Sequence, residues 1–348
     1  MTKLTSALAA TVLVVASQSA FAEGSSRFSG ELELEFAGVS TFDAPTAADE
    51  INDLYVTATL GLEYDLGGGF ALFSELIFEP VLDPVDDRFF EDNGLYVSEL
   101  GLSFSNDHLG VSVGKISPAF GLAWDAAPGF FGADVAEDYE LGESWGIAVD
   151  IPLGFASSSA GNHTLSIATM FVDTTALSDS FGEERGRADI SDGGAGNTEK
   201  LNNFAVQLAG AFGETEYNLS FRQLSAGVGD ASDETGASLG LQHGFKLGGG
   251  ELVFLGEVAR FNGFGGTVDD VTYGTLGAAY TMNKWTLSAS YTGRNGVGGF
   301  NDKLTSVGVD YDFGNDFVAA FGLSEFEEAG ATSRSIALSV VKVFSFGG

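Results

Sequence analysis

The sequence predicts an all-β fold, a transmembrane antiparallel β-barrel of about 16 strands, and three observations lead to it. Apolar and polar residues alternate along most of the chain, short and long connections alternate between these segments, and aromatic residues gather where the segments end. A period of two residues is typical of strands with two different faces. Segments of roughly ten residues suffice for a tilted strand to cross the hydrocarbon layer.

The composition fits one large β domain better than two smaller domains. The 348 residues include 49 glycines, 30 phenylalanines, only 6 prolines and no cysteine. Glycine suits many tight turns, and the aromatic and apolar content is too high for a disordered chain. Without cysteine, neither a disulfide nor a thiolate-metal framework can form.

The charge balance is strongly acidic, with 49 acidic residues against 15 basic ones and a formal net charge of −34. This balance argues against nucleic acid as a partner, because phosphate binding requires clustered lysine and arginine. It is compatible with attraction for cations, and equally with plain solubility of exposed loops. The charges that inform function are therefore those whose position on a strand face follows from the alternation.

The N-terminus resembles an export signal. Lys3 gives a positive start, residues 4–16 are apolar, and Ala20 to Ala22 form an A-x-A cleavage site, so we expect a signal peptide over residues 1–22 and a barrel domain over 23–348. The longest uncharged run, Ile151 to Val172, contains proline and glycine and is expected to form two strands and a turn rather than a membrane-spanning helix.

The first segment of the mature chain sets the pattern of alternation. Phe28, Leu32, Leu34 and Phe36 fall on one face of a strand, and the opposite face carries Glu31, Glu33 and Glu35. We expect Tyr96 to lie on the same apolar face as Leu100. In three segments the alternation is too irregular to assign an apolar and a polar face, namely residues 70–78, 109–116 and 251–261. Other apolar faces with this period begin at Leu54, Trp145, Phe204, Tyr217, Leu239, Trp285, Val307 and Ile336.

Connections between the segments alternate strictly between short and long, which predicts about eight hairpins. The short ones are at residues 67–69, 106–108, 154–162, 213–215, 248–250, 283–284 and 314–316. The long ones are at residues 40–52, 79–93, 117–142, 173–200, 226–236, 262–270, 293–302 and 327–331. Aromatic residues that flank these connections are typical of the girdles of a membrane barrel.

The third long connection, Ser117 to Gly142, lacks the alternation on either side of it and is too long for a turn. It carries five aromatic residues, Phe120, Trp124, Phe130, Phe131 and Tyr139. Its acidic residues, including one just beyond it, are Asp125, Asp134, Glu137, Asp138, Glu140 and Glu143. Long ordered loops are usually functional. We expect this loop to fold into the mouth of the barrel and to narrow the channel.

Three stretches resemble the Gram-negative outer-membrane porins, particularly general porins of the acidic alphaproteobacterial kind. GVSVGKISPAFG (110–121) resembles the strand that leads into the porin constriction loop, DVTYGTLGAAYTM (270–282) a late strand, and VVKVFSFGG (340–348) the last strand. Two features depart from that pattern: Lys342 interrupts the apolar face of the last strand, and two glycines follow Phe346.

The resemblance implies passive diffusion of small hydrophilic solutes and ions through a homotrimer in the bacterial outer membrane, in contact with lipid and lipopolysaccharide. In that family, wall arginines commonly oppose acids of the constriction loop. Here Lys115 stands at the root of the loop, and Arg222 shares strand parity with Asn218 and Ser220, which points it toward the lumen. Three further arginines are candidates without an assigned face, namely Arg27, Arg260 and Arg294.

Acidic residues on the polar faces predict a channel that prefers cations. These wall acids are Glu31, Glu33, Glu35, Glu63 and Glu99, and they add to the acids of the third long loop. Carboxylates along a pore attract cations and repel anions at close range. The alternative is that lumen lysines or bound divalent ions neutralise these glutamates.

The sequence offers no catalytic, cofactor or metal site. His108, His163 and His243 are isolated, and no metalloprotease, nucleophile-elbow or phosphate-binding run occurs. Acidic loop residues such as Asp83 and Asp192 do not match the spacing of a calcium-binding EF-hand. We therefore expect no enzyme.

Two other functions are compatible with the same barrel. In a substrate-selective channel, Trp124, Phe130, Phe131 and Tyr139 would form a sugar slide or a ligand pocket. In a non-conducting structural or adhesive barrel, the third long loop would plug the lumen.

Overall fold

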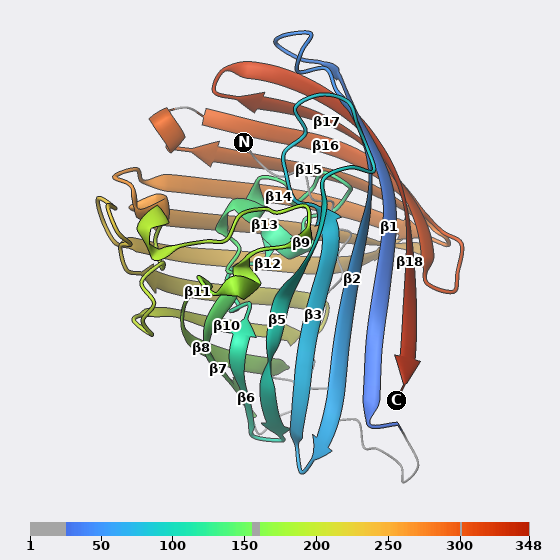
Figure 1. Ribbon diagram of the computed structural model, residues 1–348. Coiled ribbons are helices and arrows are strands. Elements are labelled where there is room, and N and C mark those ends of the chain that lie inside the picture. The colour runs from blue at the N-terminus through green and yellow to red at the C-terminus, as the bar shows by residue number, and fades with distance from the viewer. Residues whose placement is uncertain (1–25, 155–160, 300, 348) are drawn as a thin grey trace.

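The computed structural model describes residues 26–154, 161–299 and 301–347, so the expected signal peptide lies outside the described residues. The sheet contains 18 strands, of which β4 (Arg88–Phe89) and β9 (Phe181–Gly182) are two-residue segments within loops. The other 16 strands pair antiparallel in chain order, and β18 pairs with β1, so the barrel is closed (Figure 1). This confirms the predicted fold class.

The barrel strands are long, and most are joined by tight turns at one end and by longer loops at the other. We call these the short-turn end and the long-loop end. The strands are β1 (Phe28–Asp43), β2 (Asn52–Gly67), β3 (Phe70–Pro80), β5 (Asn93–Asn106), β6 (Leu109–Ile116), β7 (Ser144–Pro152), β8 (Asn162–Val172), β10 (Asn203–Phe212), β11 (Thr215–Leu224), β12 (Glu234–Leu247), β13 (Gly250–Asn262), β14 (Val271–Met282), β15 (Trp285–Asn295), β16 (Asn301–Asp312), β17 (Phe317–Glu328) and β18 (Ala331–Gly347).

The apolar side chains of these strands face outward. On β1, Phe36 is 51% exposed, whereas its neighbours Glu35 and Ala37 are buried on the inner side. The same exposed apolar face recurs at Leu239 and Leu287. An apolar exterior around a polar interior is typical of a barrel whose solvent is lipid. No helix in the described part of the chain is long and apolar enough to span a membrane.

The expected face of Tyr96 is wrong because β5 contains a bulge. Glu75 of β3 pairs with Glu99 while Leu76 pairs with Val97, which leaves Ser98 as an additional residue on β5. A bulge reverses the side-chain parity on its far side. Tyr96 therefore points inward, where its hydroxyl donates to Glu79 at 2.6 Å, while the residues after the bulge resume the expected outward pattern.

The expected long connection at residues 327–331 is also wrong, because β17 and β18 pair as far as Glu328 and Ala331. Only Ala329 and Gly330 link them, with φ angles of 50° and 81°. Two central residues with positive φ match the twist of a tight antiparallel hairpin. The two strands therefore stay paired up to this two-residue turn.

Lys342 fits the outer face of β18 without exposing its charge to lipid. Its ammonium reaches the carbonyl oxygen of Asn315 in the short turn between β16 and β17, and it lies 5.0 Å from the ring centroid of Phe344. Long basic side chains can keep their stem against apolar surface and their head in a polar layer. The outward apolar face is therefore retained around this lysine.

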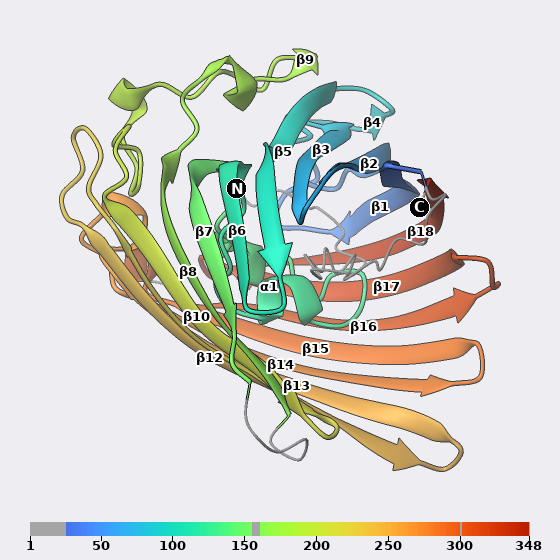
Figure 2. The same cartoon turned by 90° about the horizontal axis from the view of Figure 1, so that it is seen from below.

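The third long loop, residues 117–143, lies inside the barrel, and we call it the inner loop (Figure 2). It leaves the wall after β6, includes the short helix α1 (Ala123–Ala126) and the 3-10 turn η1 (Ala136–Tyr139), and returns as β7. Other 3-10 turns lie in the remaining loops, namely η3 (Ala176–Ser178), η4 (Ile190–Asp192), η5 (Phe264–Gly266) and η6 (Val297–Gly299). The inner loop supplies much of the buried apolar core.

Candidate functional site

The inner loop packs closely against glycines of the barrel wall. Gly277 of β14 and Gly322 of β17 face inward, where a Cβ atom would lie 2.4 Å from Pro128 Cδ and 2.9 Å from Phe130 Cβ, respectively. At Gly240 of β12 a Cβ atom would lie 2.5 Å from Asn218 Oδ1, 2.9 Å from Glu257 Oε2 and 3.0 Å from Leu122 Cβ of the loop. Because contacts this short cannot form, a side chain at any of these glycines would displace the loop.

Glu257 of β13 holds both limbs of the inner loop. Its carboxylate is 3% exposed and accepts hydrogen bonds from the backbone N–H groups of Leu122 (2.6 Å) and Ala123 (3.1 Å) and from the Tyr139 hydroxyl (2.5 Å). No lysine or arginine of the described chain lies within ion-pair distance of it. Burial and this carboxylate raise the pKa of Tyr139, so its hydroxyl remains a donor.

Glu257 was not among the residues selected from the sequence. It lies in the segment 251–261, whose faces were left unassigned. The available signal was its two-residue spacing from Leu255 and Ala259, which are both buried on the inner side.

Arg222 and Arg294 both face inward, but their charges are used to hold the inner loop. Arg222 donates to the Tyr139 carbonyl at 2.5 Å and pairs with Glu234 at 2.7 Å. Arg294 pairs with Asp138 of the loop at 2.6 Å, and also with Asp302 and Glu328. Neither guanidinium is free to act as an isolated positive charge on the lumen wall.

The other unassigned arginines lie elsewhere. Arg260 is on the outer face of β13, next to Asp270 at 3.7 Å, and its side chain is largely exposed. Arg27 directly precedes β1.

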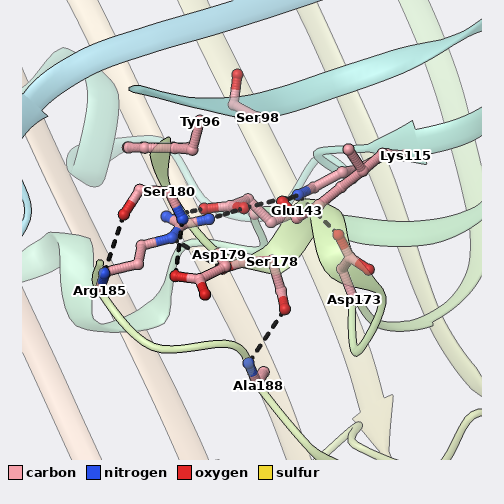
Figure 3. Close-up of polar contacts among 12 residues, drawn as sticks. Tyr96, Ser98, Lys115, Glu143, Asp173, Ser178, Asp179, Ser180, Arg185 and Ala188 are labelled. Carbon is pink, nitrogen blue, oxygen red and sulfur yellow. Dashed lines mark hydrogen bonds and ion pairs between the residues drawn. The ribbon is translucent and has the colours of Figure 1, made fainter. Parts of the chain in front are cut away.

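Lys115 lies at the end of β6 and is completely buried, so it presents no charge to the lumen. Its ammonium lies 2.8 Å from carboxylate oxygens of both Glu143 and Asp173 and donates to the Leu177 carbonyl. Gly114, with φ of 145°, directly precedes it. Figure 3 shows Lys115, Glu143 and Arg185 in a row, joined by these ion pairs.

Arg185 extends this row into residues 173–202, which we call the covering loop. Its guanidinium donates two hydrogen bonds to Glu143, at 2.8 and 2.6 Å, and lies 3.8 Å from the ring centroid of Tyr96. Burial alone would raise the pKa of Asp173, but hydrogen bonds from Lys115 and Thr175 hold it below its usual value. Glu143 and Asp173 are therefore both neutralised by buried cations.

The covering loop adds a short strand pairing to the wall near the point where the inner loop departs. β6 pairs with β5 only as far as Lys115 and Leu100, which leaves residues 93–99 of β5 without that neighbour. The covering loop contributes β9 instead, which pairs with Gly94 and Leu95. Since unpaired strand edges are costly in a membrane barrel, this pairing covers part of the edge that β6 leaves open.

The acids of the inner loop occupy different environments. Asp138 and Glu143 are bound by cations, as described above, and Glu137 is partly exposed beside Asp138 on η1. Asp134 is buried, and burial raises its pKa to about 8. Asp125 is partly buried, and burial raises its pKa as well.

Glu140 is the most exposed acid of the inner loop. Packing around its carboxylate, followed by repulsion from Asp125, Glu75, Glu143 and Glu79, raises its pKa to about 7 although the residue keeps contact with water. Its carboxylate therefore lies close to acids of β3 as well as to acids of its own loop.

The five wall acids selected from the sequence all lie on inward-facing positions. Glu31, Glu33 and Glu35 follow one another on β1, Glu63 is on β2 and Glu99 is on β5. Glu75 of β3 joins them, since it pairs with Gly61 and Glu99, and it was missed because residues 70–78 had no assigned face. Within the described residues, none of these six acids forms an ion pair.

A closed barrel with an apolar exterior, a polar interior and one loop tethered inside is the architecture of a membrane channel. The chain belongs to the Gram-negative porin family, whose family model matches residues 9–330. It is accordingly a β-barrel porin of the Gram-negative outer membrane. No curated protein matches the chain in a sequence search.

Solved porins and related channels share the fold at low sequence identity. OprB from Pseudomonas putida has a TM-score of 0.66 at 9% identity, with 91% of this chain and 94% of that chain covered. OmpF from Salmonella typhi, in a complex with daunomycin, has a TM-score of 0.64 at 12% identity, covering 93% and 99%. A porin from Comamonas acidovorans described as anion-selective has a TM-score of 0.56 at 14% identity, covering 91% and 98%.

Proposed function

We propose that this porin forms a water-filled channel for passive diffusion of small hydrophilic solutes and ions, and that it prefers cations. The observation that carries the proposal is an imbalance of charge. Wall acids on β1, β2, β3 and β5 have no basic partner among the described residues, whereas Arg222, Arg294 and Lys115 are all held in ion pairs. The net field along such a pore attracts cations.

We further propose that the inner loop sets the bore. Its exposed acid Glu140 lies within repulsion range of Glu75 and Glu79 on β3, so carboxylates contribute from both the loop and the wall. Permeating ions would meet Glu140 and Asp125 on one side and Glu75 and Glu99 on the other. The buried Asp134 and the neutralised Asp138 and Glu143 would contribute less.

The resemblance to general porins also motivates the proposal of a homotrimer in contact with outer-membrane lipid and lipopolysaccharide. The outer face offers continuous apolar surface for either kind of contact. Mass measurement of the detergent-solubilised protein would distinguish a trimer from a monomer.

A sugar-selective channel receives less support from the geometry. Three of the four aromatic side chains that would form a sugar slide, Phe130, Phe131 and Tyr139, are buried against the wall. Trp124 alone keeps partial exposure, and its indole N–H donates to the Phe120 carbonyl at 2.8 Å.

Swelling of proteoliposomes in sugars of graded size tests the proposed diffusion. We expect swelling rates that fall smoothly as the sugar becomes larger, because a fixed bore excludes solutes by size. A single sugar that enters far faster than its size allows would favour the substrate-selective channel. Absence of swelling with every sugar would favour the non-conducting barrel.

A further inference from the structure

A cavity of about 280 Å³ lies at the long-loop end, beside the inner loop and away from β3. The returning limb of the inner loop, from Asp138 to Gly142, forms one side of it. The ends of β7, β8, β10, β11 and β12 form the wall, and residues 195–196 and 264–265 form the rim. The cavity is distinct from the wall acids of β1 to β5.

The lining combines an apolar base with acidic groups. Leu141, Met170, Leu224 and Phe264 supply apolar surface. The polar donors of the lining are already occupied: Asn203 donates its amide to the carbonyls of Met170 and Gly196, and Arg222 donates to Glu234 and Tyr139. An anion entering the cavity would therefore find no free cationic donor among these groups.

The charge around the cavity is negative. Arg222 is balanced by Glu234, and Arg294 is shared among Asp138, Asp302 and Glu328. Glu140 lines the cavity, is exposed, and forms no ion pair in the described structure. Carboxylate oxygens beside apolar surface suit a ligand that carries a positive charge on an apolar body.

We propose that this cavity is a subsite for small organic cations with an apolar body, such as an aromatic or alkyl amine. The proposal rests on the proposed function, because it describes a place where such a solute pauses on its way through the channel. The volume is near the lower end of the range of about 300–1,000 Å³ that ligand pockets occupy, so the solute is small. A bare metal ion would gain nothing from the apolar base.

Ligand-observed NMR on the detergent-solubilised protein tests this binding without relying on conductance. The probes are phenethylamine, a cation, together with 2-phenylethanol and phenylacetate, which keep the ring but are neutral and anionic. Ala195→Trp fills the cavity from its rim without altering a charge. Ala231→Trp is the matched control, because Ala231 is exposed on the neighbouring loop and does not line the cavity.

We expect saturable binding of phenethylamine to the native protein and to Ala231→Trp, and loss of that binding in Ala195→Trp. Glu140→Gln should weaken the binding of phenethylamine by about two- to fivefold, which is the contribution of a partly exposed ion pair. The affinity for 2-phenylethanol should not change. Equal binding of phenylacetate, or phenethylamine binding that survives Ala195→Trp, overturns the proposal. A protein that binds phenethylamine in this pattern but gives no liposome swelling would refute the diffusion function alone.

Discussion

At the scale of single residues, the position of the inner loop depends most directly on Glu257. A buried carboxylate without a cation is costly unless hydrogen bonds compensate for its lost hydration. Three donors, two of them backbone N–H groups at the start of α1, provide this compensation. The same three bonds join the outgoing and returning limbs of the loop to one point on β13.

We expect Glu257→Gln to loosen the inner loop. The amide has one acceptor oxygen and would place an NH₂ group against a backbone donor, so hydrogen bonds to a charged group worth about 1.5–3 kcal/mol each would weaken. Single-channel recordings should show greater open-channel current noise and a changed conductance. Glu251→Gln removes the same charge from the inner face of β13 at the short-turn end, and it should leave the noise unchanged. Equal noise in the two variants would contradict the role of Glu257 as an anchor.

We expect Glu140 to give the channel a pH dependence near neutrality. With a pKa of about 7, its carboxyl is charged above that pH and neutral below it, so cation preference should fall as pH decreases from 8 to 6. Glu140→Gln should reduce the preference at pH 8 and match the native protein at pH 5.5, as measured by reversal potentials. Asp83→Asn, in an exposed loop, is the control and should follow the native curve. A native-to-variant difference that does not change with pH would rule out this account of Glu140.

Strand parity allowed the wall acids to be predicted from the sequence wherever alternation was regular. Glu31, Glu33 and Glu35 lie on the inner side as their spacing indicated. Strand parity predicted the wrong face for Tyr96 because β5 contains one additional residue. It also did not indicate that Lys115 would be completely buried. Both depend on contacts with distant segments, which a local pattern cannot contain.

At the scale of elements, two loops act on each other at one break in the wall. The inner loop leaves β5 without a full-length neighbour, and the covering loop pairs with two residues of the open edge through β9 (Figure 1). Glu143 at the end of the inner loop binds Lys115 from the wall and Arg185 from the covering loop. The covering loop therefore contributes to the placement of the inner loop's returning limb.

We expect Arg185→Ala to release the covering loop. The change removes a two-point ion pair with Glu143 and the contact with the Tyr96 ring. A charged hydrogen bond of this kind contributes about 1.5 kcal/mol. Losing it would raise the fraction of molecules in which the covering loop is detached roughly tenfold. Chymotryptic cleavage after the exposed Phe181 should accelerate by a similar factor.

Lys200→Ala is the matched control for this experiment, because it removes a cation from an exposed position of the same loop. Its cleavage rate should stay close to that of the native protein. An Arg185→Ala protein cleaved no faster than Lys200→Ala would show that the ion pair with Glu143 does not hold the loop.

The sequence indicated most strands and the special character of residues 117–142, but not how the inner loop is held. The glycines at positions 240, 277 and 322 resemble ordinary strand glycines until the loop is seen to lie against them. The connection at Ala329–Gly330 is shorter than expected because β17 and β18 continue their pairing through Glu328 and Ala331.

At the scale of the whole molecule, the outer face of the barrel contacts the membrane and the inner face lines the channel. Apolar side chains face outward toward lipid. On the inner face, the acidic side chains without an ion-pair partner far outnumber the basic ones in the described part of the chain. The formal charge of −34 alone could not establish this, because exposed loops hold many of the acids. The pairing of Lys115, Arg222 and Arg294 is what leaves the wall acids uncompensated.

The reversal potential of the reconstituted channel in a tenfold gradient of potassium chloride is the most direct test of this account. We predict a potential with the sign of potassium selectivity, declining in magnitude as salt is raised because exposed charges are screened. A potential with the sign of chloride selectivity would contradict the proposal that unpaired carboxylates govern permeation.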